Sequence, residues 1–245
     1  MQAPLSPLQQ TPPRYTPAHF SDGLLMHFRL DSTYGRVMAW LNMHLVDHGF
    51  IRVIYNNLYA IGGGMHRSSQ PSPSQIRDYK ERLGLKSILN LRGVNEFGSY
   101  ALEAEACDAL GIHLETFRLY SRQPPTRDEI HGIQAVFANL EYPALLHCKS
   151  GADRAGIGAA LFRILHLGHD VRDALTELNW RYGHFRGSQA GVLEFVLETY
   201  VARNARAPIG FMEWVDSEYD PSALEKQYLA EGWASLLNDK LLQRE

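Results

Sequence analysis

The sequence predicts one α/β domain with a central, partly parallel sheet flanked by helices and extra helices at both ends. Three observations support this prediction. Short apolar runs of strand length alternate with helical periodicity through the middle of the chain. The 245 residues suffice for a large core, and 45% hydrophobic against 21% charged residues is ordinary for a globular protein. Capping residues and glycines lie where the periodicity changes.

The N-terminal part predicts an arm followed by a helical extension. Residues 1–30 are rich in proline, which favours a flexible arm. Residues 31–54 form the extension, with helical periodicity over Tyr34–Val46 that ends near Gly49. Its apolar stripe contains Val37, Met38, Leu41, Leu45 and Val46. Because the stripe is short and its polar face lacks lysines, we expect this helix, with Trp40 and Met43, to pack on the main domain rather than on a membrane.

The next segments predict a hairpin and a capped helix. Residues 57–63 and 65–70 are typical of two short strands around Gly62–Gly64. Residues 71–84 predict a helix in which Ser72 is the N-cap and Gln75 closes a capping box.

The core then alternates between strands and helices. Strands are predicted at 86–93, 112–120 and 142–148. Helices are predicted at 99–111, 126–140 and 152–168. The helix at 126–140 begins with a second capping box, from Thr126 to Glu129.

The remaining periodicity is helical. Further helical patterns cover Val171–Tyr182, Ala190–Arg203 and Ser222–Leu242. The main domain is expected over residues 55–203, and residues 204–245 form a C-terminal helical extension.

Composition excludes several classes of protein. A net charge of -3 indicates no general affinity for nucleic acid. Cys107 and Cys148 lie in different contexts, which disfavours a disulfide and favours a reducing, cytoplasmic location. The N-terminus does not have the pattern of a signal peptide, and no apolar run is long enough for a membrane span. Peripheral contact with a membrane, or dimerisation through either extension, stays open.

The chemistry is concentrated in LLHCKSGADRAG, residues 145–156. The strand delivers Cys148 to its carboxyl end, where ligands bind in open α/β sheets. The loop Lys149–Asp153 then enters a helix, so its N–H groups and the helix dipole together form an anion site. The same field favours a thiolate over a thiol.

Arg154 completes this pattern. Its planar guanidinium matches two oxygens of a phosphate, and Gly151 and Ala152 let the backbone approach a ligand closely. These residues suit attack by a thiolate on the phosphorus of a phosphate monoester, with the transition-state oxygens stabilised by the guanidinium.

His147-Cys148-x5-Arg154 resembles the signature of the protein tyrosine phosphatase superfamily. The segments 65–76, 86–93 and 112–156 resemble bacterial dual-specificity-like phosphatases in order and spacing, within a resemblance that covers about residues 55–203. The resemblance implies Cys148 as nucleophile and Arg154 as phosphate clamp. It implies a phosphate-binding loop of Lys149, Ser150, Gly151, Ala152, Asp153 and Arg154. No metal or cofactor is implied, and the histidines show no metal-site spacing.

The sequence departs from this family at two places. The family usually has Ser or Thr after the arginine, where this chain has Ala155, which predicts slow hydrolysis of the phosphorylated cysteine. The family also places an acidic residue on a loop before the cysteine, but the corresponding segment 120–126 has no carboxylate. Asp128 and Glu129 follow it and are better explained by the start of a helix.

Asp153 is the remaining candidate for the general acid that protonates the leaving oxygen. A matching aspartate is assigned this role in phosphatases of the myotubularin type, which this loop resembles. The alternative is that Asp153 stabilises the start of the helix.

Three residues outside the loop are candidate substrate contacts. Arg67 and Arg92 follow strand patterns and are candidates to line the pocket, with structural ion pairs as the alternative. His147 is expected to support the loop by hydrogen bonding. Lys149 adds charge that suits polyanionic substrates. Arg181, His184 and Arg186 form a further, weaker candidate anion contact.

The substrate class stays open at this point. A phosphorylated protein, a phosphoinositide or other phospholipid, and an inositol phosphate or other small molecule all fit the motif. Two rivals come from other classes. One is a sulfurtransferase of the rhodanese type, against which the full Cys-x5-Arg spacing argues. The other is a phosphatase fold that binds phosphorylated partners without turnover, which Ala155 and the missing loop carboxylate favour.

Overall fold

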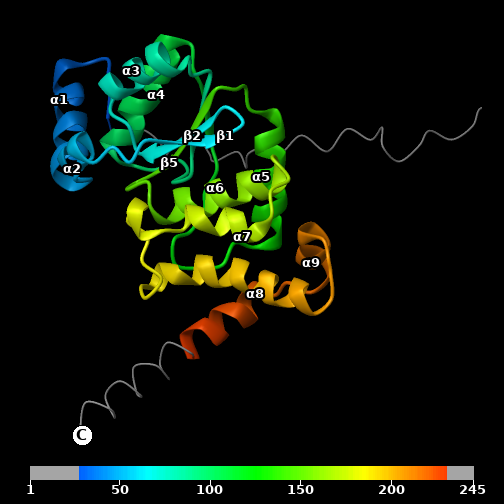
Figure 1. Ribbon diagram of the computed structural model, residues 1–245. Coiled ribbons are helices and arrows are strands. Elements are labelled where there is room, and N and C mark those ends of the chain that lie inside the picture. The colour runs from blue at the N-terminus through cyan, green and yellow to red at the C-terminus, as the bar shows by residue number, and fades with distance from the viewer. Residues whose placement is uncertain (1–27, 231–245) are drawn as a thin grey trace, which may run out of the picture.

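Adjacent residues of the central strands face two different hydrophobic clusters in the computed structural model, which describes residues 28–230. Ile88 and Leu145 pack with one cluster, whereas Leu89 and Leu146, their neighbours in the chain, pack with another. Because successive side chains of a strand point to opposite faces, both faces of the sheet are covered. Figure 1 shows helices on either side of the strands.

The sheet has five strands in the order β1-β2-β5-β3-β4. Their bounds are β1 Tyr59–Gly62, β2 Met65–Ser69, β3 Ser87–Asn90, β4 His113–Thr116 and β5 Ala144–Cys148. β1 and β2 form the expected antiparallel hairpin, and all other pairs are parallel. The predicted α/β class with a partly parallel sheet is therefore confirmed.

The helices of the central part lie where the sequence predicts them. They are α3 Pro73–Leu83, α4 Gly98–Leu110, α5 Arg127–Asn139 and α6 Asp153–Leu165. Both predicted capping boxes are present, at Ser72 and at Thr126. α3 and α4 contribute to the cluster that contains Ile88, whereas α5 and α6 contribute to the larger cluster that contains Leu146.

The N-terminal extension forms three short helical elements. They are α1 Thr33–Leu41, the π-helical turn η2 Asn42–Val46 and α2 Gly49–Ile54. The extension packs on the main domain as expected, through Met43 and Ala39 against Leu102 of α4, with Trp40 partly buried against them. The stripe residues, such as Leu41 and Leu45, are exposed instead. Small Ala39 permits a close approach to α4, and this approach turns the larger side chains outward.

The predicted helix Val171–Tyr182 is broken. It consists of α7 Val171–Ala174, the 3-10 turn η3 Leu175–Glu177 and a second 3-10 turn, η4 Trp180–Tyr182. The chain leaves the helical region at Leu178, and Asn179 caps the second turn by accepting a hydrogen bond from the Arg181 amide. Side-chain capping offers the backbone an alternative to the helix, which periodicity alone does not reveal.

The C-terminal part adds to the core. η5 Gln189–Gly191 leads into α8 Val192–Arg206, and α9 Phe211–Ser217 follows. Trp214 and Val215 of α9 are buried in the same cluster as Leu146. Residues 221–230 are helical, and the rest of the predicted helix to Leu242 lies outside the described residues, as does most of the predicted arm. Within residues 28–230 no helix is long and apolar enough to cross a membrane.

Candidate active site

Cys148 lies at the carboxyl end of β5, the central strand of the sheet. All five residues of β5 are buried, and the register places Ser69 beside Cys148 and Asn90 beside His147. Cys148 itself is 2% exposed. A buried parallel strand reads as a continuous apolar run, so the sequence places the thiol at the predicted edge of the sheet.

The loop after Cys148 needs a glycine at its third position. Gly151 has φ 74°, a conformation that residues with a side chain rarely adopt. A Cβ atom there would also lie 2.7 Å from the backbone carbon of Ser68 and 2.7 Å from the backbone nitrogen of Ser69. The loop therefore bends tightly against the end of β2.

The carbonyl groups of this loop all accept hydrogen bonds from outside it. The Gln70 amide donates to the carbonyl of Lys149 over 3.3 Å. Asn57 Nδ2 donates to the carbonyl of Ser150 over 3.1 Å. The guanidinium of Arg67 donates to the carbonyls of Gly151 and Ala152 over 2.8 and 3.2 Å. With its carbonyls held outward, the loop is left to present its N–H groups to the space beside Cys148.

These N–H groups have no acceptor in the described part of the chain. The exception is the Ala152 amide, which donates to Ser150 Oγ over 3.4 Å. The loop leads directly into α6, whose N-terminus adds the positive end of a helix dipole. The guanidinium of Arg154, at the start of α6, makes no hydrogen bond or ion pair with residues 28–230, so it is available to an anion.

Arg67 lies behind the loop. It is 0% exposed, and besides the two loop carbonyls it binds the Glu177 carboxylate over 2.9 Å. Its guanidinium also stacks over the ring of Tyr182 at 4.0 Å. The structure thus realises the alternative considered for Arg67, a structural ion pair, and places this residue away from the open side of the loop.

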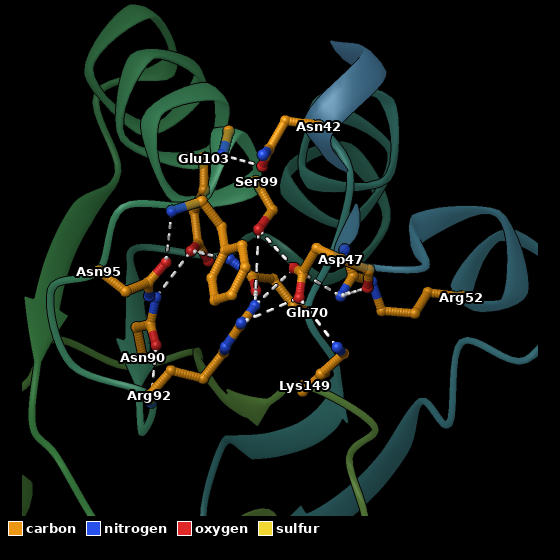
Figure 2. A network of polar contacts seen from close by, with 12 residues as sticks. Asn42, Asp47, Arg52, Gln70, Asn90, Arg92, Asn95, Ser99, Glu103 and Lys149 are labelled. Atoms are coloured by element: carbon orange, nitrogen blue, oxygen red, sulfur yellow. Dashed lines mark hydrogen bonds and ion pairs between the residues drawn. The ribbon is translucent and has the colours of Figure 1, made fainter. Parts of the chain in front are cut away.

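Arg92 and Lys149 converge on Asp47, a residue of the N-terminal extension (Figure 2). Arg92 binds the Asp47 carboxylate with two nitrogens, over 2.7 and 3.0 Å. Lys149 Nζ lies 3.2 Å from Asp47 Oδ1. Arg92 is only 7% exposed, which leaves Lys149 as the more accessible cation of the two. Arg92 is therefore held in a structural ion pair rather than open to the pocket.

Asp47 is one of the site residues that the sequence did not single out, as are Asn57, Gln70 and Glu177. It is 0% exposed, and it also accepts hydrogen bonds from Ser99 over 2.6 Å and from Arg52 over 3.0 Å. Burial alone would raise the pKa of Asp47, but the hydrogen bonds and charges of Arg92, Ser99 and Arg52 outweigh burial and hold this pKa far below its usual range. No sequence motif marks a single Asp in a turn as the partner of distant cations such as Arg92 and Lys149.

His147 is fully buried beside Glu103 of α4. His147 Nε2 lies 2.5 Å from Glu103 Oε1, at the distance of an ion pair but without the angles of a hydrogen bond. The other oxygen of Glu103 accepts hydrogen bonds from Gln70 over 2.9 Å and from Asn90 over 2.8 Å. His147 therefore lies in a buried polar group with Glu103, and neither of its ring nitrogens makes the hydrogen bond to the loop that the sequence leads us to expect.

Asp153 forms a pair with His184, which follows η4. His184 Nδ1 lies 2.8 Å from Asp153 Oδ1, and His184 Nε2 lies 3.7 Å from Glu194 of α8. Burial opposes the charge of the ring, but the hydrogen bond to Asp153 and the nearby Glu194 outweigh it and raise the pKa of His184 to about 9. The ring is therefore protonated at neutral pH, and it joins the loop to the segment after η4.

The other predicted features have simpler roles. The Glu129 carboxylate accepts from the Thr126 amide over 2.7 Å, as the capping box requires. Ala155 is fully buried in the core. Cys107 lies on α4 in the cluster that contains Ile88, and burial raises the pKa of its thiol. The described residues hold no cluster of three or more His, Cys, Asp or Glu suited to a metal ion.

No model of a known protein family matches the chain. Over 122 residues the chain is 27% identical to the dual specificity protein phosphatase TpbA of Pseudomonas aeruginosa strain PAO1, a match that covers 50% of this chain and 53% of TpbA. The TpbA of strain UCBPP-PA14 is 26% identical over 122 residues. The chain thus spans about half the length of the curated relatives it matches, at 53% of each.

Two solved structures are also similar. The crystal structure of P. aeruginosa TpbA matches with a TM-score of 0.46 and 19% identity over 71% of this chain and 91% of that chain. The core catalytic domain of the PP-IP phosphatase Siw14 from S. cerevisiae matches with a TM-score of 0.47 and 22% identity over 64% of this chain and 98% of that domain. The sequence relatives confirm the resemblance to the protein tyrosine phosphatase superfamily that residues 145–156 indicate.

Proposed function

We propose that this chain is a metal-independent cysteine phosphatase of the dual-specificity type, which hydrolyses phosphate monoesters. One observation carries the proposal. The carbonyls of the loop after Cys148 are held outward by Gln70, Asn57 and Arg67, so that its N–H groups and the unpaired Arg154 are left for an anion beside the thiol. This arrangement suits a dianion better than any neutral ligand.

The proposed reaction has two steps. In the first, the Cys148 thiolate attacks phosphorus, so that an S–P bond forms while the ester P–O bond breaks. In the second, water attacks phosphorus, the S–P bond breaks, and inorganic phosphate and the thiolate are released. Arg154 and the loop N–H groups stabilise the negative oxygens in both steps.

The leaving oxygen needs a proton, and the Asp153–His184 pair is the proposed source. Asp153 directly precedes Arg154, and its side chain is 29% exposed, whereas that of His184 is 1% exposed. The proton of the pair lies on His184 at neutral pH, since the pKa of His184 is about 9. In the proposal this proton passes from His184 to Asp153 as Asp153 protonates the leaving oxygen.

A second candidate function is a module that binds phosphorylated partners without turnover. Ala155 supplies no hydroxyl for the second step, and the segment 120–126 has no carboxylate. Both features favour slow release of phosphate from Cys148. Retention of Cys148 and of an unpaired Arg154 favours turnover.

Hydrolysis of para-nitrophenyl phosphate against pH, in the presence of EDTA, tests the proposal. The expected result is turnover by the wild type, none by Cys148→Ser, and binding of inorganic phosphate by both proteins. Binding of phosphate without turnover by the wild type would instead support the binding module. Failure of Cys148→Ser to bind phosphate by calorimetry, together with an inactive wild type, would contradict both candidates.

A further inference from the structure

Most of the large exposed hydrophobic side chains of the described residues lie in the N-terminal extension, between residues 34 and 55. The name apolar corner is used here for the exposed side chains of Val37, Leu41, Leu45, Val46, Phe50 and Ile54. Leu45 is 68% exposed and Ile54 is 91% exposed. They come from α1, η2 and α2, which lie together at one edge of the molecule (Figure 1). An exposed apolar cluster of this kind marks a surface that meets a partner.

None of the six side chains of the apolar corner is charged, and the charge at its border, Arg36, is paired with Glu105 over 2.7 Å. Between residues 37 and 58 the chain carries only two Asp, Glu, Lys or Arg residues, Asp47 and Arg52. Both are buried, at 0% and 6% exposure, and they pair with each other over 3.0 Å. The other titratable side chains in this stretch are His44, His48 and Tyr55. The surface therefore repels neither an apolar phase nor an anionic one.

The apolar corner is fixed next to the phosphate loop. Directly after Ile54, the carbonyls of Tyr55 and Asn56 accept hydrogen bonds from Ser69, over 3.3 and 2.8 Å, and Ser69 is the register partner of Cys148. Asn57 then reaches the carbonyl of Ser150. The end of α2 is thus joined to the strand and the loop that hold the thiol.

Asp47 fixes the other side of the corner. It lies between η2 and α2, and Figure 2 shows it at the centre of the cations from the main domain. Its contacts with Arg92 and with Lys149 are buried or half-buried ion pairs, so the extension cannot move as a free linker without breaking them. The apolar corner and the loop therefore keep a fixed relation.

We propose that the apolar corner docks into the interfacial layer of a lipid bilayer, and that it presents the phosphate loop to a lipid that bears a phosphate monoester. The substrate class in this proposal rests on the proposed function. A membrane lipid joins apolar chains to an anionic headgroup, and the protein places an uncharged apolar surface beside a cationic anion site. This complementarity of charge and polarity favours a lipid over a second copy of the chain, which would cover the corner but bring no anion to the loop.

The chemistry of the corner determines what kind of membrane binding to expect. Interfacial helices that rely on charge are rich in lysine and arginine, whereas this surface has only Arg36 at its border, and that guanidinium is already paired with Glu105. Burial of apolar side chains must supply the attraction instead, and this attraction is not screened by salt. Binding to uncharged phosphatidylcholine vesicles should therefore occur and should persist at high salt.

Flotation with phosphatidylcholine vesicles, at low and at high salt, is the direct test. The full chain should float with the vesicles, and Leu45→Asp/Ile54→Asp should bind about tenfold or more weakly, since two exposed apolar side chains are replaced by charges. Leu229→Asp is the matched control, because Leu229 is also 50% exposed but lies in the helix at 221–230. This control should bind like the wild type.

A second measurement separates docking from catalysis. Phosphate release is measured from phosphatidic acid in vesicles and from its soluble dihexanoyl form, for the wild type and the double variant. The expected result is a loss of about tenfold on vesicles with the rate on the soluble form unchanged. If the wild type floats with vesicles but releases phosphate from neither ester, the proposed function is overturned and the docking proposal is not.

Three results would overturn the docking proposal. They are a wild type that stays out of the vesicle fraction, a Leu229→Asp variant that loses as much binding as the double variant, and equal losses on the vesicle-borne and soluble esters. Size-exclusion chromatography with light scattering adds one more. If the wild type is a dimer that does not float and the double variant is a monomer, the apolar corner is an interface between two copies.

Discussion

His184 Nδ1 and Asp153 Oδ1 lie 2.8 Å apart, which joins the start of α6 to the segment after η4. The contact lies just beyond the broken helix at 171–182, where Asn179 starts a new turn that leads to His184. It also pairs a protonated imidazole with Asp153, the residue before the arginine that is proposed to hold phosphate.

The Asp153–His184 pair should make stability depend on pH. The pKa of His184 is raised from 6.5 to about 9, so its contribution to the free energy of unfolding is complete below pH 6.5 and is lost as pH rises through 9. We expect the difference in unfolding free energy between the wild type and His184→Gln to shrink by at most roughly 3 kcal/mol over this range. Urea unfolding at pH 6, 7.5 and 9.5 measures it, and parallel curves for the two proteins would contradict the assignment.

The same pair should matter most for esters with poor leaving groups. Phenyl phosphate requires a proton on its leaving oxygen, whereas para-nitrophenyl phosphate scarcely does. We expect Asp153→Asn to lower kcat on phenyl phosphate by about 10²-fold or more, with a much smaller effect on the activated ester. His184→Gln should likewise lower kcat more on phenyl phosphate than on para-nitrophenyl phosphate. Equal losses on both esters would assign Asp153 to the start of α6 rather than to proton transfer.

Arg67 should be required for the shape of the loop. Arg67→Met removes the donor to two loop carbonyls and leaves Glu177 short of its main cation, which we expect to cost on the order of 3–5 kcal/mol. Arg67→Met/Glu177→Gln should recover part of the stability but not the activity, because the Gly151 carbonyl loses its donor and the Ala152 carbonyl keeps only the Gly156 amide. Thermal unfolding and kcat/KM measure the two effects.

Arg82→Met is the control for this prediction. Arg82 pairs with Asp78 on the surface, at 61% side-chain exposure, so its loss should change little. If the double variant regains full activity, Arg67 does not act through the loop carbonyls.

Gly151→Ala should distort the phosphate loop. Its new Cβ would meet the backbone of Ser68 and Ser69 at 2.7 Å, and its φ of 74° would also be strained. Gly84→Ala is a matched control, since Gly84 has φ 66° but nothing within 4 Å of the added atom. The control should lose only about 1–2 kcal/mol of stability and keep its activity. Gly151→Ala should lose more stability and most of its kcat/KM.

Asp47 should stabilise the protein above acidic pH. Asp47→Asn leaves Arg92 and Arg52 buried without their carboxylate, at a cost on the order of 3–5 kcal/mol. The pKa of Asp47 is depressed, so this contribution is fully present above its unfolded value of 3.8 and is lost progressively as pH falls from there through the much lower folded pKa. Because folded Asp47 is still ionised at pH 3, lowering the pH from 7 to 3 should shrink the difference from the wild type by only about 1 kcal/mol, and urea unfolding at the two pH values measures this change.

Asp31→Asn is the control for Asp47. Asp31 pairs with Arg29 on the surface, and both side chains are more than half exposed, at 65% and 80%. Its removal should leave stability nearly unchanged at both pH values. An equally small effect for Asp47→Asn at pH 7 would show that the network around it does not hold the extension.

The local features could be predicted because each depends on neighbours in the chain. The strand that ends at Cys148, the loop and the helix that begins at Asp153 lie within one short segment. The capping boxes at Ser72 and Thr126 need residues only three positions apart. Alternation and capping are properties of short stretches, so they do not depend on how the rest of the chain folds.

The interpretation of single charged residues was less successful for the same reason. Arg67 lies on β2 as predicted, whereas Arg92 lies in the turn after β3, and both are buried against carboxylates. The apolar stripe of the extension was correctly placed on a helix, but the side that packs was not the stripe. A pattern gives the element on which a residue lies, and packing selects the face that is covered.

The sequence by itself determined the α/β order, the loop between β5 and α6, and the candidate roles of Cys148 and Arg154. Only the tertiary structure decided the partners of that loop. Glu177 is 110 residues from Arg67, Arg92 is 45 from Asp47, and His184 is 31 from Asp153. Buried charges must be paired wherever the chain brings them together, and which distant segments meet is set by the packing of the whole core rather than by any local pattern.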